Sequence, residues 1–253
     1  MPTSLFVTGA SSGIGAAFIA QTPTTVSTPL TFSRKPAEGR WTRADLSEPA
    51  QWTAVGRTVE DVLDAEGPQH AIFFHCAGTG DPVGRVADLA AEEYARSVLL
   101  NSASGPALGQ AFLSACARRG IRATLVLAGS PAATKDVPGM AQYCSSKSGM
   151  QHWARIAALE VPSDSDTRVI TVVPYAVLTD VVRSIMTQDP DEVPLVSYFR
   201  QVEAAGEFAT PETTAVQIWE AIEQADNGSV VPVGAVVIAE RAAEAASTVP
   251  TAS

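Results

Sequence analysis

The sequence predicts a single α/β domain built on a doubly wound, mostly parallel sheet with helices on both faces. Short apolar runs of the buried-strand type alternate along the chain with alanine-rich segments of helical spacing. The first apolar run leads directly into a glycine-rich turn and a second apolar segment, as strand, turn and helix. The length of 253 residues fits one large α/β domain.

The expected strands are short and apolar, and each is bounded by polar or turn-forming residues. In chain order they are Ser4–Val7, Leu30–Phe32, Ala71–Cys76, Ala123–Ala128, Arg168–Val173 and Val230–Val233. The longest expected helices are Ala91–Arg119 and Ala141–Glu160, and a later helix opens at Pro211, where proline suits the first turn. We therefore expect a domain over residues 1–240, with a substrate loop at 175–210 and a loosely held tail at 241–253.

Composition excludes several classes of partner. The formal net charge of −10 argues against binding to nucleic acid or an anionic membrane, because both select basic surfaces. The N-terminal residues lack a basic and apolar leader, and the stretch Val230–Ala239 is far shorter than the ~20 residues that span a bilayer, so we expect a cytoplasmic protein. The three cysteines and three histidines show no paired ligand spacing, so no metal is expected.

Tyr143 and Lys147 stand four positions apart, which places a phenol and an ammonium on the same face of a helix. With four tyrosines and three lysines in the chain, random placement would give roughly 0.05 such pairs. A neighbouring cation favours the phenolate and so lowers the pKa of a tyrosine. The pair is therefore interpreted as a proton donor and its tuning cation rather than as a solvated helix-surface pair.

The turn after the first strand has glycine at positions 9, 13 and 15. Residues without side chains let backbone amides and a helix N-terminus approach a pyrophosphate, which makes the turn a candidate dinucleotide site. A P-loop is excluded, because no Gly-Lys-Ser/Thr sequence follows. A purely structural glycine turn is the alternative for this motif taken alone.

Taken together, the motifs resemble the classical short-chain dehydrogenase/reductase family. They are Thr8-Gly-x-x-x-Gly-Ile-Gly15, Ala77-Gly78 after a strand, Asn101, Ser130 thirteen positions before Tyr143, and Lys147. The match covers nearly the whole chain. It implies a single-domain Rossmann fold with a mostly seven-stranded parallel sheet. More weakly, Phe199-x-x-x-Glu203 to Val230 is similar to the sepiapterin and benzil reductase branch.

The resemblance implies roles for individual residues. Ser130 would bond the substrate carbonyl, Tyr143 would donate a proton, Lys147 would tune Tyr143 and hold the ribose, and Asn101 would position a relaying water. The expected cofactor contacts are Gly9, Ser11, Ser12, Gly13, Ile14, Gly15, Ser33, Arg34, Lys35, Asp45, Leu46, Cys76, Ala77, Gly78, Tyr143, Lys147, Pro174 and Thr179. Asp45-Leu46 occupies the place where the family holds the adenine ring.

The chain departs from the family pattern at three places. His75-Cys76 replaces the two asparagines that usually precede Ala-Gly, which puts local hydrogen bonds in doubt. Cys76 and His75 otherwise read as structural residues at the end of a buried strand. Tyr175 replaces a glycine beside the expected nicotinamide. The connection Arg34–Arg43 is short, so the helix usually found there is expected to be absent.

The sequence thus predicts an NADPH-dependent carbonyl reductase. An acidic residue at the end of the second strand would repel a 2′-phosphate, whereas Ser33-Arg34-Lys35 offers a hydroxyl and two cations. The alternative class is a silent NADP(H)-binding sensor or scaffold on the same fold. A hydrolase is disfavoured, because no Gly-x-Ser-x-Gly elbow is present.

Substrate and assembly follow from the same reasoning. The expected pocket walls are mostly apolar, which favours an uncharged ketone or diketone, although Arg183 and Arg200 in the substrate loop could serve an anionic substrate if they turned inward. The two long alanine-rich helices are more apolar than one sheet face requires. With the family resemblance they imply a homodimer or homotetramer.

Overall fold

The computed structural model describes residues 3–235, so the expected tail at 241–253 lies outside the described residues. Its sheet has seven strands, all paired in parallel, in the order β3-β2-β1-β4-β5-β6-β7. The strands are β1 Thr3–Thr8, β2 Leu30–Ser33, β3 Arg40–Arg43, β4 His70–His75, β5 Arg122–Ala128, β6 Arg168–Tyr175 and β7 Val230–Gly234. The predicted fold class, a doubly wound parallel sheet, is confirmed.

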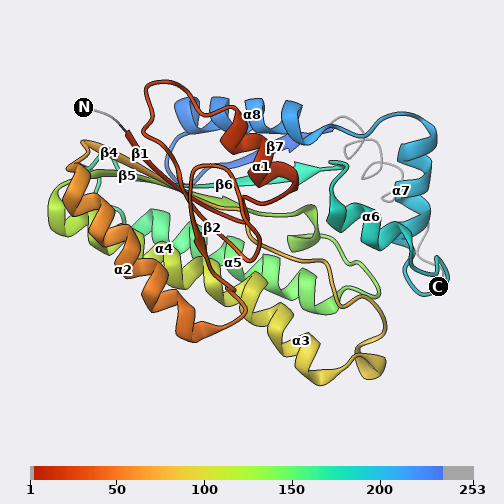
Figure 1. Cartoon of the computed structure of the whole chain (residues 1–253). Coiled ribbons are helices and arrows are strands. Elements are labelled where there is room, and N and C mark those ends of the chain that lie inside the picture. Colours follow the sequence, from red (N-terminus) through yellow and green to blue (C-terminus); the bar gives the residue numbers. More distant parts are fainter. Residues whose placement is uncertain (1–2, 236–253) are drawn as a thin grey trace.

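Helices cover both faces of the sheet (Figure 1). They are α1 Gly13–Ala20, α2 Pro49–Glu66, α3 Ala91–Val98, α4 Ser104–Arg119, α5 Ala141–Glu160, α6 Asp180–Met186, α7 Leu195–Ala204 and α8 Pro211–Gln224. Short 3₁₀ turns occupy Val86–Asp88 and Pro131–Ala133. Figure 1 shows α1 and α8 on one face, with α2, α4 and α5 on the other.

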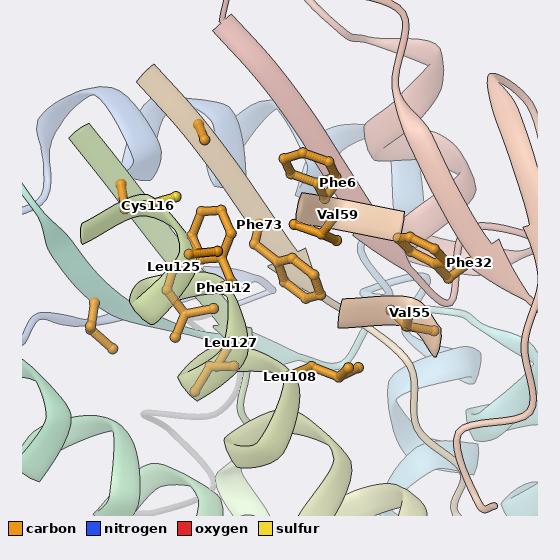
Figure 2. Packing of buried hydrophobic residues seen from close by; sticks show 14 of the residues in the cluster. Phe6, Phe32, Val55, Val59, Phe73, Leu108, Phe112, Cys116, Leu125 and Leu127 are labelled. Carbon is orange, nitrogen blue, oxygen red and sulfur yellow. The ribbon is translucent and has the colours of Figure 1, made fainter. Parts of the chain in front are cut away.

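Two apolar clusters hold these layers together. Between the sheet and helices α2, α4 and α5, the rings of Phe6, Phe73 and Phe112 pack against one another with centroids 5.4–6.4 Å apart (Figure 2). On the other face Phe18 of α1 stacks on Trp219 of α8 at 4.3 Å. Alternate residues of each strand supply the two clusters, because successive side chains of a strand point to opposite faces.

The expected helix Ala91–Arg119 is interrupted. Leu99–Ala103 forms a π-helical segment between α3 and α4, so the prediction of one regular helix was wrong at this point. Such segments arise where one extra residue is accommodated within a helix, and they occur frequently at functional sites. Here the segment carries Asn101, whose side chain is 1% exposed.

The connection after β2 contains no helix: residues 34–39 lead directly into the edge strand β3. The expected absence of a helix here is therefore confirmed. In register, Ser33 pairs with Arg43, so the carboxyl ends of β2 and β3 lie side by side. Because the strand order reverses between β1 and β4, the carboxyl ends of these two strands form the crevice where ligands bind in open α/β sheets.

Candidate active site

The glycine turn between β1 and α1 is packed too tightly for any other residue at two positions. A Cβ on Gly15 would stand 2.3 Å from the Gly9 carbonyl oxygen, and a Cβ on Gly9 would stand 2.7 Å from the Ala77 backbone. Gly9 also has φ of +70°, in the left-handed region that favours glycine. The turn therefore lies directly against the segment that follows β4.

The N-terminus of α1 fits a bound pyrophosphate. Ser12, the N-cap residue, makes no side-chain capping bond, and the first turn of the helix has no acidic residue. The amides at this end thus keep the positive end of the helix dipole available to an anion. Gly13 faces Thr179, since a Cβ on Gly13 would lie 3.4 Å from the Thr179 methyl group. The predicted turn residues and Thr179 are therefore brought together.

A chain of hydrogen bonds links the end of β4 to the π-helical segment. Thr8 Oγ1 accepts bonds from the amides of Cys76 and Ala77 at 3.2 Å. Its hydroxyl lies 3.0 Å from His75 Nδ1, and His75 Nε2 lies 3.3 Å from Ser104 Oγ, which donates to Leu100 O. Burial, together with the charge of Lys147, lowers the pKa of His75 to about 3, so His75 is neutral. His75 is thus part of a buried hydrogen-bond chain at the position where the sequence departs from the family pattern.

Cys76 lies at the predicted cofactor site but has the character of a structural thiol. Burial raises its pKa to about 11, against the opposing effects of Lys147 and the Gly15 amide. An inert thiol of this kind is not a nucleophile at neutral pH. Within residues 3–235, no three His, Cys, Asp or Glu side chains are grouped so that they could hold a metal ion.

The four predicted catalytic residues come from three parts of the fold. Ser130 follows β5, Tyr143 and Lys147 lie on α5, and Asn101 lies on the π-helical segment. The Ser130 hydroxyl lies near enough to Tyr143 to lower the pKa of the phenol. Gly78 joins this group to the cofactor segment, since a Cβ there would lie 3.1 Å from Asn101 Oδ1 and 3.7 Å from Lys147 Nζ.

Burial dominates the electrostatics of Tyr143 and Lys147. Lys147 Nζ donates to Ala128 O at 2.8 Å and lies 5.6 Å from the centre of the Tyr143 ring. Burial lowers the pKa of Lys147 to about 8. Burial raises the pKa of Tyr143, and the Ser130 hydrogen bond only partly offsets it. The expected lowering of the tyrosine pKa was thus wrong for the protein alone, because desolvation disfavours the charged phenolate.

Gln151 anchors the backbone of Ser130 through a hydrogen bond. Gln151 Nε2 donates to the Ser130 carbonyl at 3.3 Å, and a Cβ on Gly129 would lie 2.4 Å from that same nitrogen. The Ser130 hydroxyl accepts a bond from the Ala132 amide at 3.2 Å. This leaves its proton free to be donated elsewhere. The sequence analysis did not identify Gln151. Its position two helical turns after Tyr143, on the same helix, could have indicated that it lies near the site.

At the end of β2 the side chains of Arg34 and Lys35 are exposed, whereas Ser33 is buried. Ser33 Oγ donates to Lys35 O at 2.6 Å and accepts from the Trp41 indole nitrogen at 3.1 Å. The hydroxyl of Ser33 therefore shapes the turn, and the two cations are the groups open to an anion. The residues present fit a phosphate near the ribose.

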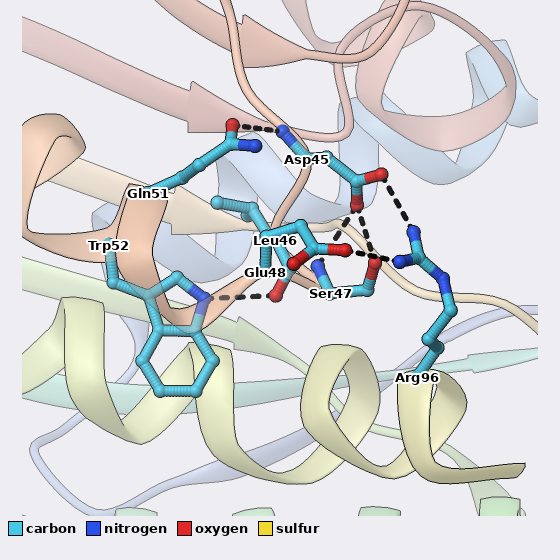
Figure 3. Close-up of polar contacts among 7 residues, drawn as sticks. All are labelled: Asp45, Leu46, Ser47, Glu48, Gln51, Trp52 and Arg96. Carbon is cyan, nitrogen blue, oxygen red and sulfur yellow. Dashed lines mark hydrogen bonds and ion pairs between the residues drawn. The ribbon is translucent and has the colours of Figure 1, made fainter. Parts of the chain in front are cut away.

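Asp45 is anchored by a network of polar contacts (Figure 3). Its carboxylate accepts bonds from Ser47 Oγ at 2.6 Å and Arg96 at 2.9 Å, and Arg96 also pairs with Glu48. Burial pushes the pKa of Asp45 upward, but Ser47 and the charges of Arg96 and Arg34 hold it below its usual value. Arg96, on α3, thereby connects the expected adenine pocket to the helix that leads to Asn101.

The segment after β6 carries local strain. Ala176 has φ of +41°, and it is the only residue other than glycine with positive φ in the described part of the chain. It follows Pro174 and Tyr175 at the predicted nicotinamide wall, and backbone bonds between this segment and Ala209 hold it in place. Strained backbone of this kind is concentrated at functional sites.

The segment predicted as a substrate loop, residues 175–210, forms an apolar cluster with Met140. Helices α6 and α7 contribute the buried side chains Val182, Ile185, Val196 and Phe199, which pack with Met140. Tyr143 and Cys144 lie against the same cluster. Arg183 and Arg200, in the same segment, are exposed. Helices α6 and α7, called the lid below, therefore present hydrocarbon rather than charge to Tyr143.

Comparison with known proteins agrees with this arrangement. The family model described as short chain dehydrogenase matches residues 3–190. The chain, with its parallel sheet, glycine turn and Ser-Tyr-Lys grouping, belongs to the short-chain dehydrogenase family of oxidoreductases.

Individual relatives are distant in sequence. The chain is 23% identical over 175 residues to the benzil reductase ((S)-benzoin forming) of Bacillus subtilis, covering 68% of this chain and 72% of the relative. A short-chain dehydrogenase/reductase structure from Saccharomyces cerevisiae superposes with a TM-score of 0.77 at 19% identity, covering 92% and 96% of the two chains. A levodione reductase superposes at 0.75 with 19% identity, covering 94% and 98%. These structural likenesses establish the fold.

Proposed function

We propose that the protein is an NADPH-dependent carbonyl reductase that converts an uncharged ketone or diketone to an alcohol. The observation that carries the proposal is the grouping of Ser130, Tyr143 and Lys147 beside Gly78 and the glycine turn. A hydroxyl pair with a neighbouring amine is suited to protonating a carbonyl oxygen while hydride reaches its carbon.

In the proposed reaction the protein supplies positioning and a proton. When bound, the reduced nicotinamide supplies the hydride that adds to the carbonyl carbon. The electron pair of the C=O bond moves to oxygen, which Ser130 holds by a hydrogen bond and Tyr143 protonates. Lys147 then stabilises the resulting tyrosinate, and a proton returns to Tyr143 by way of Lys147 and a water positioned near Asn101.

The apolar lining of the lid favours an uncharged substrate. Its inner side is the apolar cluster around Met140 and Phe199, and the arginines of the loop are exposed. A carboxylate or phosphate would lose its hydration in such a pocket without a guanidinium to replace it. The names of two similar proteins, benzil reductase and levodione reductase, are consistent with diketone reduction.

Cofactor choice rests on the end of β2. Arg34 and Lys35 are exposed there, and Arg34 lies close enough to Asp45 to lower its pKa. Two cations beside the ribose site would attract the 2′-phosphate of NADPH. Location in the cytosol stays a prediction; among the described residues, no helix is long and apolar enough to cross a membrane.

A screen of NADPH oxidation tests the proposal. The purified protein is offered 1,2-diketones, aromatic ketones, aldehydes, keto acids and sugar phosphates at equal concentration. We expect turnover on the uncharged diketones and aromatic ketones. NADPH binding with silence across the whole panel would instead favour the sensor or scaffold function, and a preference for anionic substrates would direct attention to Arg183 and Arg200.

A further inference from the structure

We propose that Gln142 is a positioning residue that holds residues 79–82 against helix α5 beside the proposed proton donor Tyr143. These four residues follow the predicted cofactor contact Gly78 and face Met140 and α6, so we assign them as one wall of the proposed substrate pocket. This inference rests on the proposed reductase function.

Gln142 is completely buried, with 0% of its surface exposed, and it directly precedes Tyr143 in the first turn of α5. Its Nε2 donates to Gly80 O at 3.3 Å and to Pro82 O. Both partners are carbonyl oxygens, which can only accept, so the amide nitrogen has to face them. One side chain therefore fixes two backbone groups of the wall.

The other end of the wall is fixed by Asn101. Asn101 Oδ1 accepts a bond from the Thr79 amide at 3.0 Å, and its Nδ2 donates to Thr79 O at 2.8 Å. Carboxamides from α5 and from the π-helical segment thus hold opposite ends of one short loop. The loop can be displaced only if one of these two attachments is lost.

The wall is also the surface on which the lid rests. A Cβ on Gly80 would lie 3.1 Å from a Val181 methyl group and 3.7 Å from Met140 Cε. Ser184 Oγ of α6 donates to Asp81 Oδ1 at 3.2 Å. Movement of the wall would therefore shift α6 as well, and the pocket would lose its fixed width.

The energetics of Gln142 argue for a role beyond stability. Its Oε1 is buried and has no hydrogen-bond partner among the described residues. An unpartnered buried acceptor is destabilising, and an apolar side chain of similar length would avoid that cost. The benefit that offsets this cost is the pair of bonds donated to the wall.

Gln142→Met and Gln142→Glu test the inference. Methionine keeps the length and apolar stem and loses both donated bonds. Glutamate keeps the shape and, having no amide protons, donates at most one bond. Gln224→Met, on the exposed end of α8, is the matched control. We expect both Gln142 variants to raise the KM for benzil about tenfold, with kcat within about threefold of wild type and the Kd for NADPH unchanged.

Hydrogen exchange in the absence of substrate separates this inference from the proposed function. The amides of residues 79–81, 83 and 84 should exchange at least tenfold faster in the Gln142 variants than in wild type or Gln224→Met. Unchanged exchange, or a fall in kcat with unchanged KM, would overturn the role of Gln142. A wild type that reduces no carbonyl compound would overturn the proposed function, while the exchange rates would still decide whether Gln142 holds the wall.

Discussion

Among single residues, burial is the main cause of the pKa shifts of Tyr143, Lys147 and His75. Burial raises the pKa of Tyr143, lowers the pKa of Lys147 to about 8 and lowers the pKa of His75 to about 3. Each shift favours the neutral form of the group. Any lowering of the tyrosine pKa would therefore require contacts that form when cofactor and substrate bind.

The buried histidines should make the protein sensitive to acid. An unfolded histidine gains a proton near pH 6.5, whereas His75 and His70 stay neutral down to about 3 and 4. The unfolded state therefore binds more protons as the pH falls below 6.5, and stability is lost. Each histidine should contribute about 2 kcal/mol of this loss between pH 6.5 and 4.5. The check is the free energy of unfolding in urea at both pH values for wild type and His75→Asn, with the variant losing about 2 kcal/mol less.

Ala176→Gly should stabilise the protein. A left-handed conformation costs alanine roughly 1–2 kcal/mol, and glycine relieves this at an entropic cost of about 0.5–1 kcal/mol. With φ of +41° at Ala176, we expect a net gain of about 0.5–1 kcal/mol in the free energy of unfolding. Urea denaturation measures it, and a less stable variant would show that Ala176 is not strained.

At the scale of elements, the long and apolar segments were predictable and the exposed ones were not. Strands β1, β4, β5 and β6 are buried on both faces and read as continuous apolar runs. The edge strand β3, Arg40-Trp41-Thr42-Arg43, is largely exposed, so its sequence carries no such run. Helix α2 was also missed, although Val55, Val59 and Leu63 mark its buried face at helical spacing.

The residues of the candidate site likewise divide into those that the sequence predicts and those that it does not. Tyr143, Lys147 and the glycine turn carry motif spacing and were identified from sequence. Residues that act through one side-chain hydrogen bond to a distant segment have no characteristic motif spacing. Gln142 reaches Pro82 across 60 positions, and Arg96 reaches Asp45 across 51. Only the packing of α3 and α5 against the loops brings these partners together.

The end of β2 should control cofactor choice, and Arg34→Asp tests this. The aspartate would repel the 2′-phosphate of NADPH and accept bonds from the ribose hydroxyls of NADH. We expect kcat/KM for NADPH to fall at least tenfold and that for NADH to rise. Arg40→Asp is the control. Arg40 begins β3, at the end of the strand away from Ser33 and Arg34, and it pairs with Glu66. Equal use of both cofactors by the wild type would contradict the assignment.

At the scale of the whole molecule, one face of α5 is left with apolar side chains toward solvent. Leu159 is 82% exposed and Ile156 is 42% exposed. Together with the family resemblance, this supports the proposal of a homodimer or homotetramer through the long helices. Light scattering at micromolar concentration should give a mass of two or four times 26.3 kDa. A mass near 26.3 kDa would contradict it.

In the proposed reaction Tyr143 protonates a substrate carbonyl during a cofactor-dependent reduction. The most direct test compares wild type with Tyr143→Phe, using a diketone that the wild type reduces and NADPH binding measured in parallel. Because general acid catalysis contributes about 10²–10⁴-fold, kcat should fall by at least a hundredfold while the Kd for NADPH stays within about twofold. A Tyr143→Phe variant that turns over at the wild-type rate would contradict the account.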